Sequence, residues 1–111
     1  MMHAHPFGLS TAWNGARHQA AADLLDEHQR LGFRRLEPYC HWTLEQLDEL
    51  AREARARDMD ITSLHGPCPV PSEPNGARGR WGDWLASTYE PDRAYAVDVM
   101  KRTVDAAAEV G

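Results

Sequence analysis

Two residues of the sequence are candidates for proton transfer, and both belong to strand-like segments. Glu37 lies within residues 34–40, and His65 ends the segment of residues 60–65. Carboxylate and imidazole groups are the side chains that enzymes most often use as general acids and bases. We therefore predict that Glu37 and His65 are catalytic and that His65 can also bind a substrate hydroxyl.

Each of these two residues also has a purely structural interpretation. A carboxylate that points into an interior needs a partner, because an unpaired buried charge is costly. An ion pair with Arg34 or Arg35 would supply that partner for Glu37. For His65 the structural interpretation is a hydrogen bond at the mouth of the fold. The residues alone leave both interpretations open.

Four ring-bearing residues fall near the ends of the first two strand-like segments, and aromatic rings with a polar edge suit the faces and hydroxyls of sugars. We predict that they bind substrate: Trp13, Tyr39, His41 and Trp42. The alternative is ordinary packing at the rim of the sheet.

Other chemistry-bearing residues are expected to be structural. Cys40 and Cys68 offer too few ligands for a metal site and too few thiols for a disulfide framework, so we expect buried, inert thiols. His3 and His5 form a pair before the first strand, where we expect a disordered terminus.

Two further pairs lie outside the strands. His18 and His28 belong to the first predicted helix, and we expect surface or interface groups. Arg78 and Arg80 lie among glycines in a long loop over residues 67–90, and we expect them to be solvated. A substrate phosphate is the alternative partner of these two arginines, if the loop acts as a lid.

The elements that position these residues follow a repeating order. Strand-like segments begin at residues 7, 34 and 60, and each is followed by a segment with helical spacing. Parallel neighbours need such a crossover helix to bring the chain back. The predicted strands span residues 7–13, 34–40 and 60–65, and the predicted helices span residues 19–31, 43–57 and 91–111.

Local signals mark the helix ends. Gly32 occupies the position of a left-handed C-terminal residue, Thr43 and Gln46 fit a capping box, and Pro91 suits a first helical position. The apolar stripe of the second helix is predicted to be Leu44, Leu47, Leu50, Ala51 and Ala54. That of the third helix is predicted to be Val97, Met100, Val104 and Ala107.

Composition limits the class of protein. The chain has 111 residues, is 42% hydrophobic and carries 17 acidic against 12 basic side chains, for a formal charge of −5. This balance argues against a protein whose main partner is nucleic acid or an anionic membrane. The apolar runs are far shorter than the roughly 20 residues of a membrane span. We expect a soluble, cytoplasmic α/β protein.

The order of these units resembles the N-terminal part of the xylose isomerase-like (β/α)8 barrels, which include the sugar phosphate isomerases and epimerases. Three segments carry the resemblance, namely residues 7–13 (FGLSTAW), residues 32–37 (GFRRLE) and residues 61–67 (ITSLHGP). A complete barrel of this kind has about 250 residues. The resemblance therefore implies a partial barrel with about three of the eight units.

The resemblance implies metal-assisted isomerisation or epimerisation of a small sugar or polyol. The implied cofactor is a divalent ion (Mn, Mg, Co or Zn), with the family's ligands expected beyond Gly111 and His65 as a possible ligand. We expect the 111 residues alone to be inactive and expect a homo-oligomer to be one way of covering the open sheet edge. The alternatives are an endonuclease IV-like abasic-site enzyme and a non-catalytic module in which half-barrels assemble.

Overall fold

The computed structural model describes residues 5–39, 42–68 and 84–111. Its strands are β1 (His5–Ser10), β2 (Phe33–Glu37) and β3 (Asp60–Ile61). Its helices are α1 (Ala21–Arg30), α2 (Leu44–Ala56) and α3 (Glu90–Val110), together with the short 3-10 helices η1 (Gly15–Arg17) and η3 (Trp84–Ala86). The chain is thus a mixed α/β protein with strands and helices in alternation.

The three strands form one parallel sheet in the order β1-β2-β3, which confirms the predicted parallel pairing. Leu9, Leu36 and Ile61 lie side by side in the register, so their side chains share one face of the sheet. The neighbouring row of Gly8, Arg35 and Asp60 belongs to the opposite face because side chains alternate along a strand.

All three strands differ in extent from the predictions. The first starts at His5 and ends at Ser10, so His5 belongs to the sheet, which corrects the prediction of a disordered terminus for this residue. The second ends at Glu37 and the third at Ile61. The third predicted strand was too long. Beyond Ile61 the backbone forms only isolated hydrogen bonds with the neighbouring segment, such as that from the His65 amide to the Pro38 carbonyl at 2.9 Å.

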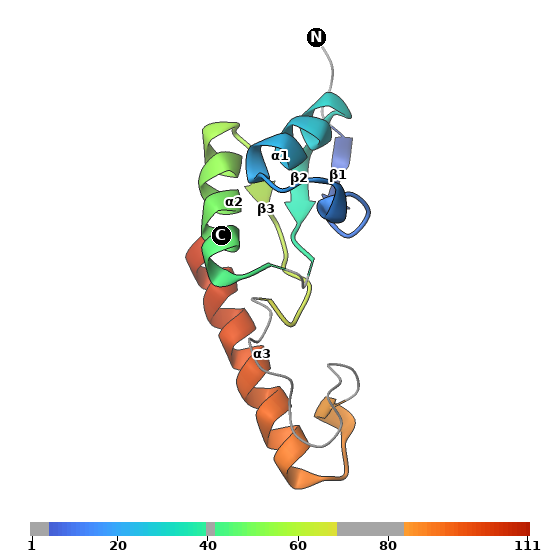
Figure 1. The fold of residues 1–111 in the computed structure, drawn as a ribbon, viewed down its shortest axis with the longest axis vertical. Coiled ribbons are helices and arrows are strands. Elements are labelled where there is room, and N and C mark those ends of the chain that lie inside the picture. Colours follow the sequence, from blue (N-terminus) through green and yellow to red (C-terminus); the bar gives the residue numbers. More distant parts are fainter. Residues whose placement is uncertain (1–4, 40–41, 69–83) are drawn as a thin grey trace.

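Helices α1 and α2 lie on the same side of the sheet (Figure 1), and the core fills the space between them and the strands. Leu36 of the central strand packs in this core with residues from α1, α2 and the C-terminal end of α3. The side chains of the opposite face are more open, since Arg35 and Asp60 are exposed and Glu37 is half-buried. The sheet therefore presents one apolar and one polar face.

The predicted helix ends are confirmed where local chemistry determines them. Gly32 has a φ of 85°, which is the left-handed conformation expected after α1. Thr43 and Gln46 form the capping box at the start of α2, with the Gln46 amide donating to the Thr43 hydroxyl at 3.2 Å. Pro91 stands in the first turn of α3. Leu44, however, is exposed, because it belongs to the first turn of α2, beside the cap.

The apolar stripe predicted for α3 is wrong by one position. Val97 and Val104 are 40% and 67% exposed, whereas their neighbours Ala96 and Thr103 are buried. The buried stripe contains Ala96, Val99, Thr103 and Ala106, and the loop after β3 approaches this face of the helix closely. A Cβ added to Gly66 would lie 2.7 Å from the methyl group of Met100. Val97 and Val104 point away, whereas Val99 and Val110 are buried.

Helix α3 also determines the shape of the described chain. Its C-terminal end packs on the core, while its N-terminal part extends away from the sheet toward η3 (Figure 1). The molecule accordingly measures 54 × 25 × 22 Å along its principal axes. Within the described residues, none of the helices combines the length and the apolar character needed to cross a membrane.

Candidate functional site

The two predicted catalytic residues lie at the C-terminal ends of neighbouring parallel strands. Glu37 is the last residue of β2, and its Oε2 accepts a hydrogen bond of 2.5 Å from Ser63 Oγ, just beyond β3. The alternative ion pairs are not formed. Arg34 pairs with Asp58 at 2.5 Å, and Arg35 donates to the Pro6 carbonyl at 2.6 Å. The Glu37 carboxylate is therefore half-buried and held by a neutral hydroxyl.

His65 lies against a predicted substrate-binding residue. Its ring centroid is 4.5 Å from that of Tyr39, with the two rings tilted by 48°. The His65 side chain remains exposed and the Tyr39 side chain is half-buried. Glu37, Tyr39, Ser63 and His65 together form what we call the strand-end cluster. It combines a carboxylate, an imidazole and a phenol ring at one edge of the sheet.

A buried threonine connects this cluster to Trp42. Thr11 follows β1 and is only 2% exposed, and its Oγ1 accepts hydrogen bonds from Tyr39 N at 2.9 Å and Trp42 Nε1 at 3.3 Å. The loops after β1 and β2 are thereby joined at one oxygen atom. Beside it lies a cavity of about 530 Å³, which we call the Thr11 cavity. Its lining includes Thr11, Gly15, His18, Tyr39, Trp42 and Gln46.

Two predicted substrate-binding residues are not placed in this cavity. Trp13 is 45% exposed and stacks under the Arg17 guanidinium, 4.7 Å from its ring centroid. Its indole is therefore a partner for a neighbouring side chain, in line with the packing alternative. His41 lies outside the described residues, as do Cys40, His3 and the loop arginines Arg78 and Arg80. Cys68 is buried, as predicted.

Sequence reasoning missed a polar cluster between η1 and α1. Glu27 Oε1 accepts hydrogen bonds from Asn14 Nδ2 at 2.9 Å, from Arg17 at 2.9 Å and from His18 Nε2 at 3.0 Å. Asn14 Oδ1 in turn lies 3.2 Å from His28 Nε2. Four side chains thus form a continuous hydrogen-bonded line from His18 through Glu27 and Asn14 to His28.

The environment of this line shifts two pKa values. The hydrogen bonds from His18 and Asn14 to the Glu27 carboxylate lower its pKa, assisted by the charge of Arg17. Burial lowers the pKa of His28 to about 4, because the interior disfavours the charged imidazolium. At neutral pH the line therefore contains an ionised Glu27 and a neutral His28.

The burial of His28 corrects the prediction of a surface or interface group. The His28 side chain is fully buried, and His18 is largely covered, with 19% of its side chain exposed. A signal for His28 was present in the sequence, since it continues the helical spacing of Ala21, Leu24 and Leu25. The contact between His18 and Glu27 had no such signal, because it depends on how η1 turns back onto α1.

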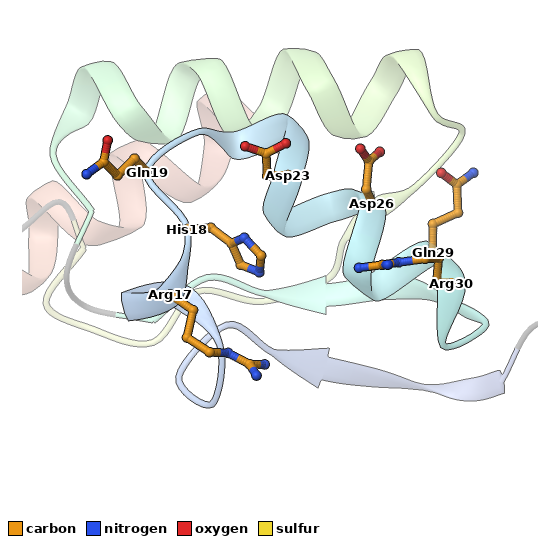
Figure 2. Close-up of a pocket in the computed structure, with 7 residues that line it drawn as sticks. All are labelled: Arg17, His18, Gln19, Asp23, Asp26, Gln29 and Arg30. Atoms are coloured by element: carbon orange, nitrogen blue, oxygen red, sulfur yellow. The ribbon is translucent and has the colours of Figure 1, made fainter.

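A second hollow follows the outer side of α1 (Figure 2). The carboxylates of Asp23 and Asp26 and the side chain of Arg30 project from the helix into it, with Arg17 and His18 at its other side. Opposite charges alternate here, and Asp26 is already paired with Arg57 at 3.1 Å. The groove is therefore a solvated, mixed-charge surface, and the Thr11 cavity is the better candidate site.

The implied divalent metal can be tested against the residues present. In the parts of the chain that the structure describes, no three His, Cys, Asp or Glu side chains gather closely enough to hold an ion. The described residues therefore do not by themselves fit a metal centre.

Comparison of the chain with protein-family models, with curated proteins and with solved structures finds no match.

Proposed function

We propose that the chain belongs to a (β/α)8 barrel enzyme that isomerises or epimerises a small sugar or polyol, and that the strand-end cluster is part of its substrate site. The observation that supports this proposal is the pairing of Glu37 with Ser63 and of Tyr39 with His65 where neighbouring parallel strands end. Active sites of (β/α)8 barrels occur at this end of the strands. The polar sheet face with Arg35 and Asp60 agrees with a barrel interior that further strands would enclose.

The proposed reaction is a proton transfer between neighbouring carbons of the substrate. The Glu37 carboxylate accepts the proton from the carbon next to the carbonyl and returns it to the former carbonyl carbon, while the proton of the neighbouring hydroxyl moves to the carbonyl oxygen. Its bond from Ser63 Oγ holds the carboxylate in place without neutralising it. His65, exposed beside Tyr39, binds a hydroxyl of the same substrate, and the Tyr39 ring covers the sugar's apolar face.

The first prediction concerns sugar binding by the chain as it stands. Titration with D-xylose or D-fructose should shift the NMR signals of Glu37, Tyr39, Trp42 and His65 selectively. Glu37→Gln should weaken binding about tenfold, because a charged hydrogen bond to a hydroxyl is worth roughly 1.5 kcal/mol or more. The substitution retains an oxygen that can accept from Ser63, so the fold should persist.

The matched control is Glu49→Gln, which makes the same change on the exposed surface of α2 and should bind like the wild type. Loss of the sugar-induced NMR shifts in Glu37→Gln, with their retention in Glu49→Gln, would assign Glu37 to the substrate site. A folded wild-type chain in which neither sugar shifts the strand-end signals contradicts the proposal.

A further inference from the structure

The hydroxyl of Thr11, which lines the Thr11 cavity, still has one hydrogen-bonding position available. A threonine hydroxyl has two acceptor lone pairs and one hydrogen. Both acceptor positions of Thr11 Oγ1 are used, by the Tyr39 amide and by the Trp42 indole N–H. The hydroxyl hydrogen is consequently left to be donated, and Thr11 lines the cavity. The side chain is therefore a fixed, buried donor on a residue that lines the cavity.

His18 supplies the complementary acceptor through its contact with Glu27. An ionised carboxylate can only accept, so the short contact between Glu27 Oε1 and His18 Nε2 places a proton on Nε2. In the neutral imidazole the other nitrogen, Nδ1, then carries a lone pair. Among the described residues no side chain or amide donates to Nδ1, and His18 lines the same cavity as Thr11.

The remaining lining agrees with a polar but uncharged ligand. Gln46 Oε1 accepts from the Thr43 amide at 3.0 Å in the capping box, which leaves the Gln46 NH₂ group to donate into the cavity. Tyr39 and Trp42 add aromatic surface. A volume of about 530 Å³ lies within the range of cavities that hold small molecules.

We propose that the Thr11 cavity binds a hydroxyl group of a polyol or sugar, with Thr11 Oγ donating to the hydroxyl oxygen and His18 Nδ1 accepting the hydroxyl proton. A hydroxyl is the neutral group that both accepts and donates, so it satisfies this pair completely. Glu27 acts as a positioning residue, since it sets the orientation of the His18 ring. The inference rests on the proposed function, because Tyr39 both lines the cavity and belongs to the strand-end cluster.

The tautomer of His18 is tested first, in the ligand-free chain. The nitrogen NMR shifts of the neutral His18 imidazole should show a protonated Nε2 and a bare Nδ1. Glu27→Gln should reduce this preference, because the glutamine amide can offer either a donor or an acceptor. A wild-type His18 that carries its proton on Nδ1 overturns the inference, whatever sugars the chain binds.

Ligand binding is tested second, with xylitol as the probe because it has hydroxyls and no carbonyl. His18→Ala and Thr11→Val should each weaken xylitol binding about tenfold, which corresponds to the loss of one buried hydrogen bond. Thr11→Ser keeps the hydroxyl and should bind like the wild type even if Thr11→Val proves unstable. Asp23→Asn, which alters only the groove along α1, is the matched control.

The two proposals fail in different ways. If D-xylose shifts the strand-end signals while neither sugar nor xylitol perturbs His18 and Gln46, the hydroxyl site is wrong and the proposed function stands. If xylitol shifts the cavity signals and D-xylose leaves Glu37 and His65 unchanged, the hydroxyl site stands without the isomerase assignment. If none of these probes shifts any signal of the folded chain, both are wrong.

Discussion

At the scale of single residues, Glu27 organises the polar side chains around the Thr11 cavity. One of its oxygens receives three donors, and through Asn14 it is linked to the buried His28. His28 Nδ1 is buried, and no described residue forms a hydrogen bond with it. Such a group is stable only as the neutral ring, because protonation would create a buried charge. The line of polar residues therefore makes stability depend on pH.

The second prediction follows from the pKa of His28. Its value of about 4 in the folded chain lies below the ordinary 6.5, so the unfolded state binds the proton more readily between these values. The stabilising effect is complete above pH 6.5 and is lost as the pH falls toward 4. The free energy of unfolding, measured in urea, should drop by roughly 2.5 kcal/mol between pH 7.5 and 4.5 through this residue.

Substitution separates this effect from that of other groups. His28→Gln can still donate to Asn14 Oδ1 but cannot titrate, so most of the drop between pH 7.5 and 4.5 should disappear. His65→Gln replaces an exposed histidine, leaves His28 intact and should retain the drop. Glu27, whose pKa is lowered, loses its contribution mainly below pH 4.5, outside this window. An unchanged pH dependence in His28→Gln would contradict the assigned burial.

At the scale of elements, a buried hydrogen bond helps to attach α3 to the rest of the chain. Thr103 is buried, and its Oγ1 accepts from the Cys68 amide at 3.0 Å while donating to the Val99 carbonyl at 3.2 Å. The helix is thus joined to the chain segment after β3 by a side-chain hydrogen bond. The exposed Val104 next to it makes no comparable contribution to the core.

The third prediction compares these two neighbouring positions. Thr103→Val keeps the volume but removes the acceptor of the Cys68 amide, and should lower the free energy of unfolding by about 1 kcal/mol or more. Thr103→Ser should recover most of that loss. Val104→Thr makes the reverse change on the exposed face and should lie within about 0.5 kcal/mol of the wild type. Equal effects at both positions would mean that the helix is rotated from the orientation described.

At the scale of the whole molecule, one core joins the sheet to all three helices. Leu36 is fully buried in the central strand, among residues of α1, α2 and α3. A single core in a chain of this size favours unfolding in one cooperative step. The large apolar side chain of Phe7 is 72% exposed and lies outside this core.

The fourth prediction tests that cooperativity. Leu36→Ala should reduce the free energy of unfolding by about 2–5 kcal/mol, since it leaves a cavity where the sheet meets the helices. Circular dichroism and tryptophan fluorescence should report the same shifted midpoint in urea. Phe7→Ala, also a large apolar truncation, should have little effect. Separate midpoints for the two signals would show that the elements do not share one core.

Several features could be predicted from the sequence because local chemistry determines them. The order of strands and helices followed from hydrophobic spacing, and the ends of helices at Gly32, Thr43 and Pro91 followed from capping and left-handed geometry. These features depend on residues a few positions apart. The contacts between Glu37 and Ser63 and between Tyr39 and His65 form where the ends of neighbouring parallel strands meet at one edge of the sheet. The roles of these residues stay predictions.

Tertiary packing decided the rest, because it depends on which distant atoms meet. The face that α3 buries differs by one residue from the predicted stripe, because the close approach of Gly66 to Met100 determines how the helix is rotated. The alignment of His18 with Glu27 required η1 to fold back onto α1, and the donor facing the cavity arose only when Thr11 met Tyr39 and Trp42 from another loop. Periodicity can assign a residue to an element, but contacts between elements determine which of its atoms remain available for a ligand.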